Sequence, residues 1–263
     1  MLAKERQAFI AEAVRARGAV RVSDLVSDLQ VSDMTIRRDL DKLAQLGMVE
    51  KVHGGATVPG RSTDEPGFER KSTRERAEKD AIAALASTLV RPGDAVGLSS
   101  GTTTWTLAHR LSDVAHITVV TNSVQIASIF YTRGRDDQTV VLTGGVRTPS
   151  DALVGPLAVA ALRQLNLDLV FLGVHGMDEK TGFTSPNLLE SETSRALAHA
   201  GRRLAVVADH TKWGVVGLST IVPLADADIV VTDSGLHADA QAVLRLQVDE
   251  VLVAPVSSAS RAS

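Results

Sequence analysis

The chain has 263 residues and a formal net charge of −3 at pH 7, with 44% hydrophobic and 22% charged residues. This composition is typical of a globular protein with room for about two domains, and no apolar run approaches the ~20 residues of a membrane span. The charge argues against a protein that coats nucleic acid by bulk positive charge. Cysteine is absent, which excludes a disulfide scaffold and thiol catalysis and fits a reducing cytoplasm.

Charged residues occupy the amino-terminal stretch, where a signal peptide would have its apolar run. Lys4 and Arg6 precede any apolar segment, and Glu12 and Arg15 interrupt the segment that follows. We therefore expect no signal peptide and a cytoplasmic protein.

Three helical patterns fill the first 45 residues. Residues 3–17 and 22–29 carry apolar side chains at helical spacing. The third pattern starts after Ser32, a residue that can cap a helix, and has Asp33 in its first turn, where the helix dipole favours a negative charge. Residues 30–32 form a tight turn between the second and third helices, which predicts a helix-turn-helix.

The third helix has one apolar side and one basic side. Ile36, Leu40 and Leu43 are spaced i, i+4 and i+7, so they are predicted to form a buried stripe. A short helix with a packed back, a basic front and small side chains in its first turn suits a DNA major groove. The face opposite the stripe carries Met34, Arg38 and Lys42, flanked by Thr35 and Arg37.

A hairpin is predicted after this helix. Residues 48–52 and 56–58 bracket a His-Gly-Gly turn whose glycines permit positive φ. The hairpin would be a wing, with Lys51 and His53 placed to meet phosphates or the minor groove. The alternative is an ordinary three-helix unit with a solvated charged face, but the ordered combination of helix, helix, turn, helix and wing favours DNA binding.

The first 57 residues are nearly neutral, with nine Lys and Arg against eight Asp and Glu. A single domain of this charge should bind DNA weakly, so useful affinity requires two or more copies on adjacent half-sites. We therefore expect a homodimer or a homotetramer.

The rest of the chain reads as a linker and an α/β domain. Residues 59–72 are rich in Pro, Gly and charge, which is typical of a linker. A helix is expected from about Thr73 to Arg91, and beyond it short apolar runs alternate with helical patterns. This alternation predicts a mainly parallel sheet covered on both faces. The predicted strands are 95–98, 117–121, 139–143, 168–174, 204–208, 229–232 and 250–253, and the helices between them are 103–111, 124–131, 156–164, 188–200 and 238–246.

Polar or glycine-rich loops follow five of these strands, at the carboxyl edge where ligands of such sheets bind. The first, residues 99–104, offers helix-start amides and hydroxyls to a phosphate, and it lacks the Gly-Lys-Ser/Thr ending of a nucleotide-hydrolysing loop. The alternative for this loop is an ordinary hydroxyl-rich helix cap. Together the five loops predict a pocket for a small phosphorylated polyol. The other four are 121–123, 143–145 with 153–156, 173–178 with 182–187, and 208–214.

Two segments, Val31–Leu40 and Val52–Ala56, resemble signatures of the DeoR family of bacterial transcriptional regulators. The similarity covers nearly the whole chain, because the remainder resembles the family's sugar-phosphate sensor. It implies an α/β fold class: a winged helix-turn-helix over residues 1–58, a linker over 59–72, and a Rossmann-like effector and oligomerisation domain over 73–263. That second domain would be related to ribose-phosphate isomerases and CoA transferases.

The resemblance also assigns effector contacts. Gly101, Thr102 and Thr103 would grip phosphate, and Lys212 would add positive charge beside it. His175 lies at a position where a small residue is frequent in the family, and its side chain could contact the ligand or fill space. Ser194 and Trp213 replace a frequent Lys and Phe, which leaves the effector's identity open. The remaining predicted effector residues are Ser99, Asn122, Gly144, Gly145, Asn187, Glu190 and Asp209, of which Glu190 and Asp209 would take sugar hydroxyls.

The expected function is a sequence-specific DNA-binding repressor of a carbohydrate catabolism operon, controlled by a phosphorylated sugar. In this interpretation Thr35 and Arg38 read bases and Met34 touches a thymine methyl, while Ser32 caps the helix. The phosphate contacts would be Arg6, Arg37, Lys42 and Lys51.

The alternative is a sugar-phosphate isomerase or transferase, in which Glu190, Asp209 and Lys212 supply acid–base chemistry. An isomerase has no use for the first 57 residues, and fold does not carry function with it, so we expect no enzyme activity. We also expect no cofactor and no metal, because the seven histidines show no paired ligand spacing and cysteine is absent.

Overall fold

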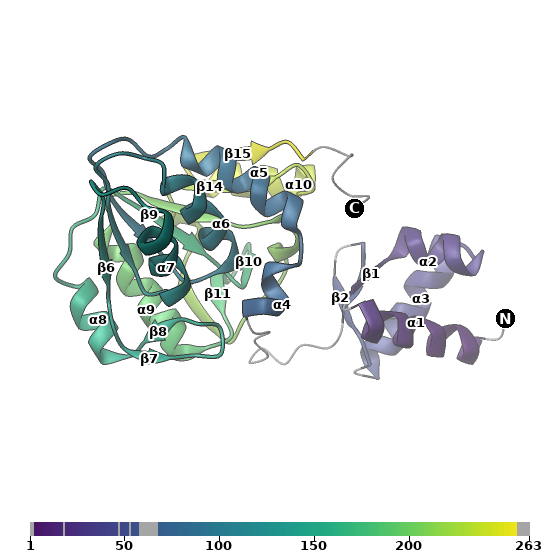
Figure 1. The fold of residues 1–263 in the computed structure, drawn as a ribbon. Helices are drawn as coiled ribbons and strands as arrows, with labels where there is room; N and C mark the ends of the chain where they lie inside the picture. The colour runs from purple at the N-terminus through teal and green to yellow at the C-terminus, as the bar shows by residue number, and fades with distance from the viewer. Residues whose placement is uncertain (1–2, 18, 47, 53, 58–67, 257–263) are drawn as a thin grey trace. The chain divides into compact units, whose positions relative to one another are not determined.

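The computed structural model describes residues 3–17, 19–46, 48–52, 54–57 and 68–256 (Figure 1). The chain divides into two compact units, residues 1–64 and 65–263. The predicted wing residue His53 and most of the predicted linker, residues 59–67, lie outside the described residues.

The described residues of the first unit form three helices and a three-stranded antiparallel sheet, as a winged helix-turn-helix requires. The sheet order is β1-β3-β2, so the predicted hairpin is present and a third strand is added to it. The close approach of β1 explains a glycine in the wing, because a Cβ on Gly55 would lie 2.1 Å from the carbonyl oxygen of Val20. The elements are α1 (Ala3–Arg17), β1 (Ala19–Arg21), α2 (Val22–Leu29), α3 (Asp33–Gln45), β2 (Glu50–Val52) and β3 (Gly55–Thr57).

The predicted apolar stripe of α3 forms the centre of this unit's core. Ile36, Leu40 and Leu43 are at most 1% exposed and pack with Ile10 of α1 and Leu25 of α2. Burial of these side chains, each stabilising by about 1.5–3 kcal/mol, sets the face that α3 turns away from solvent. The basic face of α3 follows from the same helical geometry.

The second unit is built on a seven-stranded parallel sheet with the order β15-β14-β12-β9-β4-β5-β6. This confirms the predicted fold class and every predicted strand. The sheet strands are β4 (Ala95–Leu98), β5 (Thr118–Thr121), β6 (Thr139–Leu142), β9 (Leu169–Gly173), β12 (Leu204–Val207), β14 (Ile229–Asp233) and β15 (Glu250–Ala254). The helices are α4 (Phe68–Ser72), α5 (Arg76–Ser87), α6 (Thr102–Leu111), α7 (Val124–Arg133), α8 (Pro156–Leu162), α9 (Leu188–Ala200) and α10 (Ala238–Gln247).

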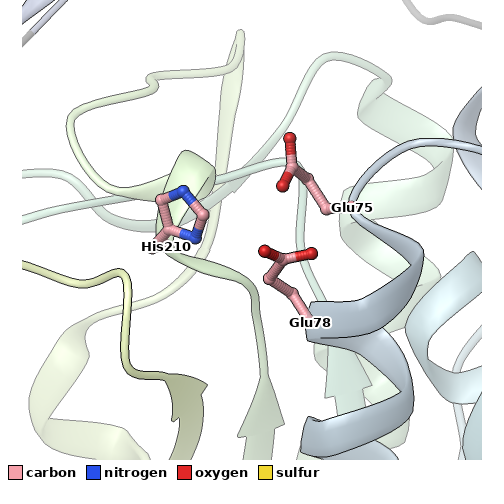
Figure 2. Close-up of side chains that lie close together, drawn as sticks. All are labelled: Glu75, Glu78 and His210. Atoms are coloured by element: carbon pink, nitrogen blue, oxygen red, sulfur yellow. The ribbon is translucent and has the colours of Figure 1, made fainter. Parts of the chain in front are cut away.

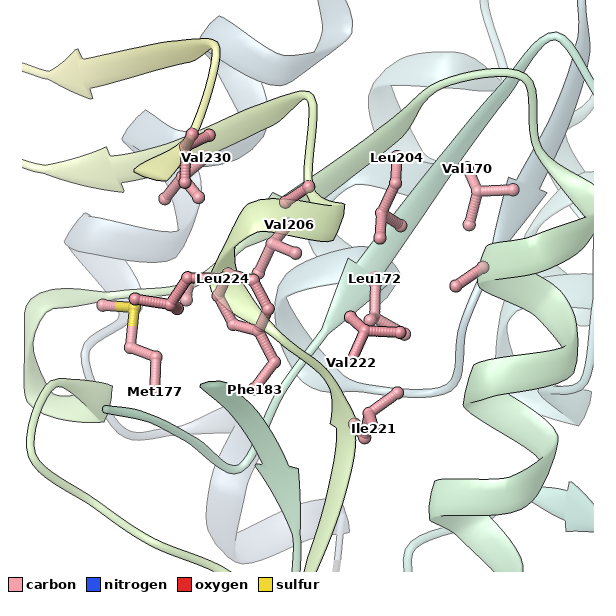
Figure 3. Packing of buried hydrophobic residues seen from close by; sticks show 14 of the residues in the cluster. Val170, Leu172, Met177, Phe183, Leu204, Val206, Ile221, Val222, Leu224 and Val230 are labelled. Carbon is pink, nitrogen blue, oxygen red and sulfur yellow. The ribbon is translucent and has the colours of Figure 1, made fainter. Parts of the chain in front are cut away.

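Helices cover both faces of the sheet, and two hydrophobic clusters result. Consecutive residues of β9 enter opposite clusters: Val170 and Leu172 lie in one with α9 and α10, and Leu169 and Phe171 lie in the other with α5, α6 and α7. Figure 3 shows the first cluster, in which Phe183 packs among side chains of the sheet. Burial on both sides explains why these strands read as continuous apolar runs.

The direction of strand addition reverses between β4 and β9. From β4 the chain adds β5 and β6 toward one edge, and it then returns to add β9, β12, β14 and β15 toward the other. Because all seven strands are parallel, their carboxyl ends lie along the same side of the sheet, here called its carboxyl edge, as distinct from the outermost strands β6 and β15. The reversal of strand order opens a crevice at the carboxyl edge, beside the ends of β4 and β9.

Several elements were not predicted. Residues 68–72, expected to be linker, form α4, where the ring of Phe68 meets that of Trp105 edge-on at a centroid distance of 6.0 Å. Two small antiparallel sheets are also present. They were not predicted, because their strands are too short to show a hydrophobic period in the sequence. They contain β7 (Val146–Arg147) with β8 (Leu153–Val154), and β10 (Gly176–Asp178) with β11 (Gly182–Ser185) and β13 (Ser219–Val222). Two 3₁₀ turns, His210–Lys212 and Leu224–Asp226, complete the second unit.

Among the described residues we find no helix with the length and apolar character of a membrane span.

Candidate functional site

The first turn of α3 is organised by the predicted cap. Ser32 has extended backbone angles, and its side chain accepts a hydrogen bond from the backbone N–H of Thr35 at 3.3 Å. The two hydroxyls are also bonded to each other at 2.8 Å. This network fixes the start of the helix and places both hydroxyls on its amino-terminal turn, the part of a recognition helix that meets base edges.

The outward face of α3 is exposed and carries the expected side chains. Met34 is 69% exposed, and Arg38 and Lys42 are also exposed. The guanidinium of Arg37 is held by Asp33, one turn earlier, at 2.5 Å. Both members of that pair are 57% exposed, so the contact orients Arg37 more than it stabilises the helix.

Arg6, predicted to bind phosphate, has a different placement. Its side chain is 13% exposed and forms an ion pair of 2.5 Å with Asp39 on the inner side of α3, and Gln7 donates to the same carboxylate at 2.8 Å. These bonds explain how an aspartate can be only 4% exposed beside the apolar stripe. Arg6 therefore joins α1 to α3. Lys51 lies on β2, and its side chain lies outside the described residues.

In the second unit, the loop after β4 lies at the reversal point of the sheet. The Ser99 hydroxyl accepts a hydrogen bond from Gly173 N–H, at the end of β9, at 2.9 Å. Thr104 donates to the carbonyl oxygens of Ser99 and Gly101 at 2.7 and 3.0 Å. Among the residues that the structure describes, no side chain caps the amino terminus of α6, which begins at Thr102. The first-turn amides and the positive end of the helix dipole are therefore placed for an anion.

The loops after β5 and β6 join this arrangement in different ways. Asn122 is 3% exposed; its side-chain oxygen accepts from Ser100 N–H at 2.9 Å and its amide donates to Leu153 O at 3.1 Å. Asn122 thus joins the loop after β4 to β8. Gly145 is required by packing, because at φ 122° a Cβ would lie 2.5 Å from the carbonyl oxygen of Val154. Gly144, also at positive φ, has open space around its Cα.

Glu190 and Asn187 lie at the start of α9. The side-chain oxygen of Asn187 caps the helix by accepting from the backbone N–H groups of Leu189 and Glu190 at 3.0 and 3.2 Å. One carboxylate oxygen of Glu190, which is 8% exposed, accepts from the hydroxyls of Thr148 and Ser150. Both predicted effector residues therefore carry structural bonds to neighbouring backbone and hydroxyl groups.

Asp209 has an oxygen that the fold leaves unbonded. Its side chain is 1% exposed; Oδ1 accepts from Thr211, whereas Oδ2 has no hydrogen-bond partner in the described part of the chain and lies 4.0 Å from Lys212 Nζ. A buried carboxylate oxygen without a donor is costly and often marks a place for a ligand. Asp209 and Lys212 follow β12, at the same sheet edge as the loop after β4. His175, also at this edge, is half-buried, and its backbone N–H bonds Thr184 O at 3.1 Å.

Lys79 of α5 is a buried cation near Asp209 that was not predicted. Its Nζ donates to the carbonyl oxygens of Lys71 and Arg74 at 2.5 Å each. Burial lowers the pKa of Lys79 to about 8, against the opposing influence of Asp209. No local motif signals this residue, because its partners lie in α4, in the turn between α4 and α5, and after β12.

Glu75, Glu78 and His210 point toward one another at the start of α5 (Figure 2). Each offers one ligand atom, and these atoms lie within 4.8 Å of one another, so the three could hold a metal ion. His210 Nδ1 bonds buried Asp233 at 2.9 Å. That bond raises the pKa of His210, and it holds the pKa of Asp233 down although burial acts to raise it. Burial and then the charge of Glu78 raise the pKa of Glu75.

A hollow of about 300 Å³ lies at the opposite edge of the sheet, beside the amino end of β12. Its lining includes Arg202, Asp226 and Asp228. Sheets of this type bind ligands at the carboxyl edge and the reversal point. The loops after β4, β9 and β12 are therefore the stronger candidate for an effector site.

The first unit is a winged helix with a basic, exposed helix face. The second unit is a doubly wound sheet with polar loops at its reversal point. Together they have the architecture of a transcriptional regulator that carries a small-molecule sensor. Residues 6–62 match the DeoR-like helix-turn-helix domain, and residues 74–234 match the DeoR C terminal sensor domain. The chain belongs to the DeoR family of transcriptional regulators.

Curated relatives align with almost the whole chain. YgbI of Escherichia coli (strain K12), an uncharacterized HTH-type transcriptional regulator, is 37% identical over 97% of this chain and 99% of its own length. The glycerol-3-phosphate regulon repressor of the same organism is 30% identical over 88% and 90%. Among solved structures, ribose 5-phosphate isomerase A from Neisseria gonorrhoeae aligns over 57% of each chain, with a TM-score of 0.40 and 16% identity.

Proposed function

We propose that this protein is a repressor of a carbohydrate catabolism operon, and that a phosphorylated sugar bound by the second unit controls its DNA binding. The observation that carries the proposal is the uncapped amino terminus of α6 at the reversal point of the sheet, in a chain whose other unit is a winged helix. Names of relatives support it: one represses the glycerol-3-phosphate regulon, and another is a putative aga operon repressor, 31% identical over 95% of this chain.

We assign DNA contacts to the exposed face of α3 and to the wing. Thr35 and Arg38 would read base edges, and Met34 would contact a thymine methyl group, since all three lie on the first turns of the helix. Phosphates would be bound by Arg37 and Lys42, by Lys51 and His53 of the wing, and by the helix start at Ser32. Arg6 is left out because, unlike the exposed pair of Arg37 and Asp33, its side chain is largely buried where it bonds Asp39.

We assign the effector's phosphate to the turn Gly101–Thr103 at the start of α6, where amides and hydroxyls converge. Asp209 would accept a sugar hydroxyl through its unbonded Oδ2, and Lys212 would supply positive charge. Ser99, Asn122, Gly145, Asn187 and Glu190 would act by holding the loops in place, because their polar atoms or close packing join neighbouring segments. Gly144 and His175 would line the site.

Sensing and DNA binding would be coupled through an oligomer. Half-sites lie one helical turn, about 34 Å, or a multiple apart, so two recognition helices must keep that spacing. An effector that binds one arrangement of protomers more tightly would change the affinity of the protein for DNA. Bound DNA would change the affinity for the effector by the same factor, because the coupling free energy is reciprocal. Residues 1–58 would bind DNA and residues 73–263 would sense and oligomerise.

A ligand panel and an operator selection test the proposal together. A ligand at a hundred times its dissociation constant stabilises the folded state by about 2.7 kcal/mol, so phosphorylated sugars should raise the melting temperature and their unphosphorylated parents should not. Selection from fragmented genomic DNA at physiological salt should recover a preferred sequence. Recovery of no preferred fragment, with or without the stabilising sugars, would contradict the regulator proposal.

Catalysis is the alternative, and a turnover assay addresses it. The curated relatives are regulators, and the carboxylate of Glu190 is engaged by two hydroxyls of the same chain. We therefore expect no turnover when the protein is incubated with pentose and hexose phosphates. Steady isomerisation that Asp209→Asn abolishes would identify an enzyme instead.

A further inference from the structure

The edge strand β6 exposes apolar side chains on both of its faces. All four of its residues, Thr139–Leu142, are exposed, with Val140 and Val141 each at 37% and Leu142 at 42%. Successive side chains of a strand point to opposite faces, so consecutive exposed residues mean that both faces are incompletely covered. This is unusual in a parallel sheet, which is normally buried on both sides.

Neighbouring elements extend the apolar surface. Val124 and Tyr131 are seven residues apart on one side of α7, which packs against β6, and they are 43% and 91% exposed. Val146, which follows β6, is 68% exposed. In Figure 1, β6 is the outermost strand on one side of the large sheet. An apolar patch on an unpaired edge strand is a surface that requires a partner.

The two edges of the sheet differ in charge and cover. The opposite edge strand, β15, begins at exposed Glu250 and is packed by α5 and α10. β6 has the sequence Thr-Val-Val-Leu, which contains no charge. When a twofold axis brings β6 against its own copy, the strands run antiparallel and no like charges face each other. The same operation on β15 would place one exposed Glu250 carboxylate at each end of the pairing, where β6 has uncharged Thr139.

We propose that β6 of one chain pairs with β6 of a second copy across a twofold axis, so that the two seven-stranded sheets form one continuous sheet. The pairing satisfies the free backbone N–H and C=O groups of both edges, and it buries Val140, Val141 and Leu142 of both copies. The inference deepens the proposed function, which needs two winged helices in one particle, and it names the surface that joins them.

The absence of cysteine allows a direct test on the full chain. Single cysteines are introduced at each position from 139 to 142, and the proteins are treated with a short bismaleimide at micromolar concentration. Leu246→Cys, on α10 and 86% exposed, is the matched control. We expect covalent dimer from the β6 variants at a yield at least about tenfold above the control, since cross-strand Cβ atoms are about 5 Å apart when directly opposed and about 7–8 Å apart on the diagonal, within reach of the reagent.

Light scattering on a charge variant completes the test. Val141→Lys places like charges across the axis and should raise the dimer dissociation constant at least about tenfold, whereas Leu246→Lys should leave it unchanged. A wild-type monomer at micromolar concentration, or a dimer whose β6 cysteines react no better than Leu246→Cys, would overturn the proposal. Cross-linking at β6 without recognition of any operator would support the β6 interface and contradict the proposed regulator function.

Discussion

The ion pair between Arg6 and Asp39 allows a quantitative test of how the DNA-binding unit is held together. The two side chains are 13% and 5% exposed, and they link α1 to α3 at 2.5 Å. Removing one partner of a buried pair costs about 3–5 kcal/mol, and the residual exposure of Arg6 favours the lower end. We therefore expect Arg6→Met to lower the free energy of opening of the first unit by about 3 kcal/mol, which is roughly 100-fold in the opening equilibrium.

The assay must report on the first unit alone. Trp105, Trp213 and Tyr131 all lie in the second unit, so intrinsic fluorescence does not follow the first. Hydrogen exchange of α1 and α3 peptides does, and protected amides there should exchange about 100-fold faster in Arg6→Met than in the wild type. The double variant Arg6→Met/Asp39→Leu should recover most of the loss, because it leaves no unpaired buried charge.

Arg38→Met is the matched control, since it removes an exposed arginine from the outer face of α3. It should leave exchange unchanged and weaken operator binding. A structural role of Arg6 is contradicted if Arg6→Met leaves exchange of α1 and α3 unchanged while its affinity for every duplex falls and its salt slope drops by about one. That result would make Arg6 a phosphate contact.

Three further outcomes follow from the placement of single side chains. Arg38→Ala should lose about 1–3 kcal/mol of discrimination at one base pair, whereas Lys42→Ala should weaken binding to all duplexes alike and lower the salt slope by about one; anisotropy titrations at several salt concentrations separate the two. Thr103→Val should keep the unliganded melting temperature and lose the shift caused by phosphorylated sugars. The raised pKa of His210 means that its ion pair with Asp233 stabilises the protein fully below the ordinary histidine pKa of about 6.5 and less as pH rises through the raised value. Urea melts should therefore show His210→Gln destabilised more at pH 6 than at pH 8.5, and an equal loss at both would contradict the assignment.

Much of the fold is determined by local sequence patterns. The stripe Ile36, Leu40, Leu43 and the cap Ser32 specify α3 without reference to the rest of the chain, because both depend on spacings of a few residues. The seven apolar runs specify the strands of the large sheet for the same reason. That the polar loops share one edge also follows, since parallel strands joined by helices all end on the same side.

Tertiary packing decided what individual polar side chains do. Arg6 and Asp39 are 33 positions apart, and Thr148 and Glu190 are 42 apart. His210, which follows β12, bonds Asp233 at the end of the neighbouring strand β14. A spacing rule cannot find such pairs, because they depend on which helices and strands become neighbours. The exposure of Val140 and Val141 is of the same kind: their sequence reads as a buried strand, and only the order of strands in the sheet places them at its edge.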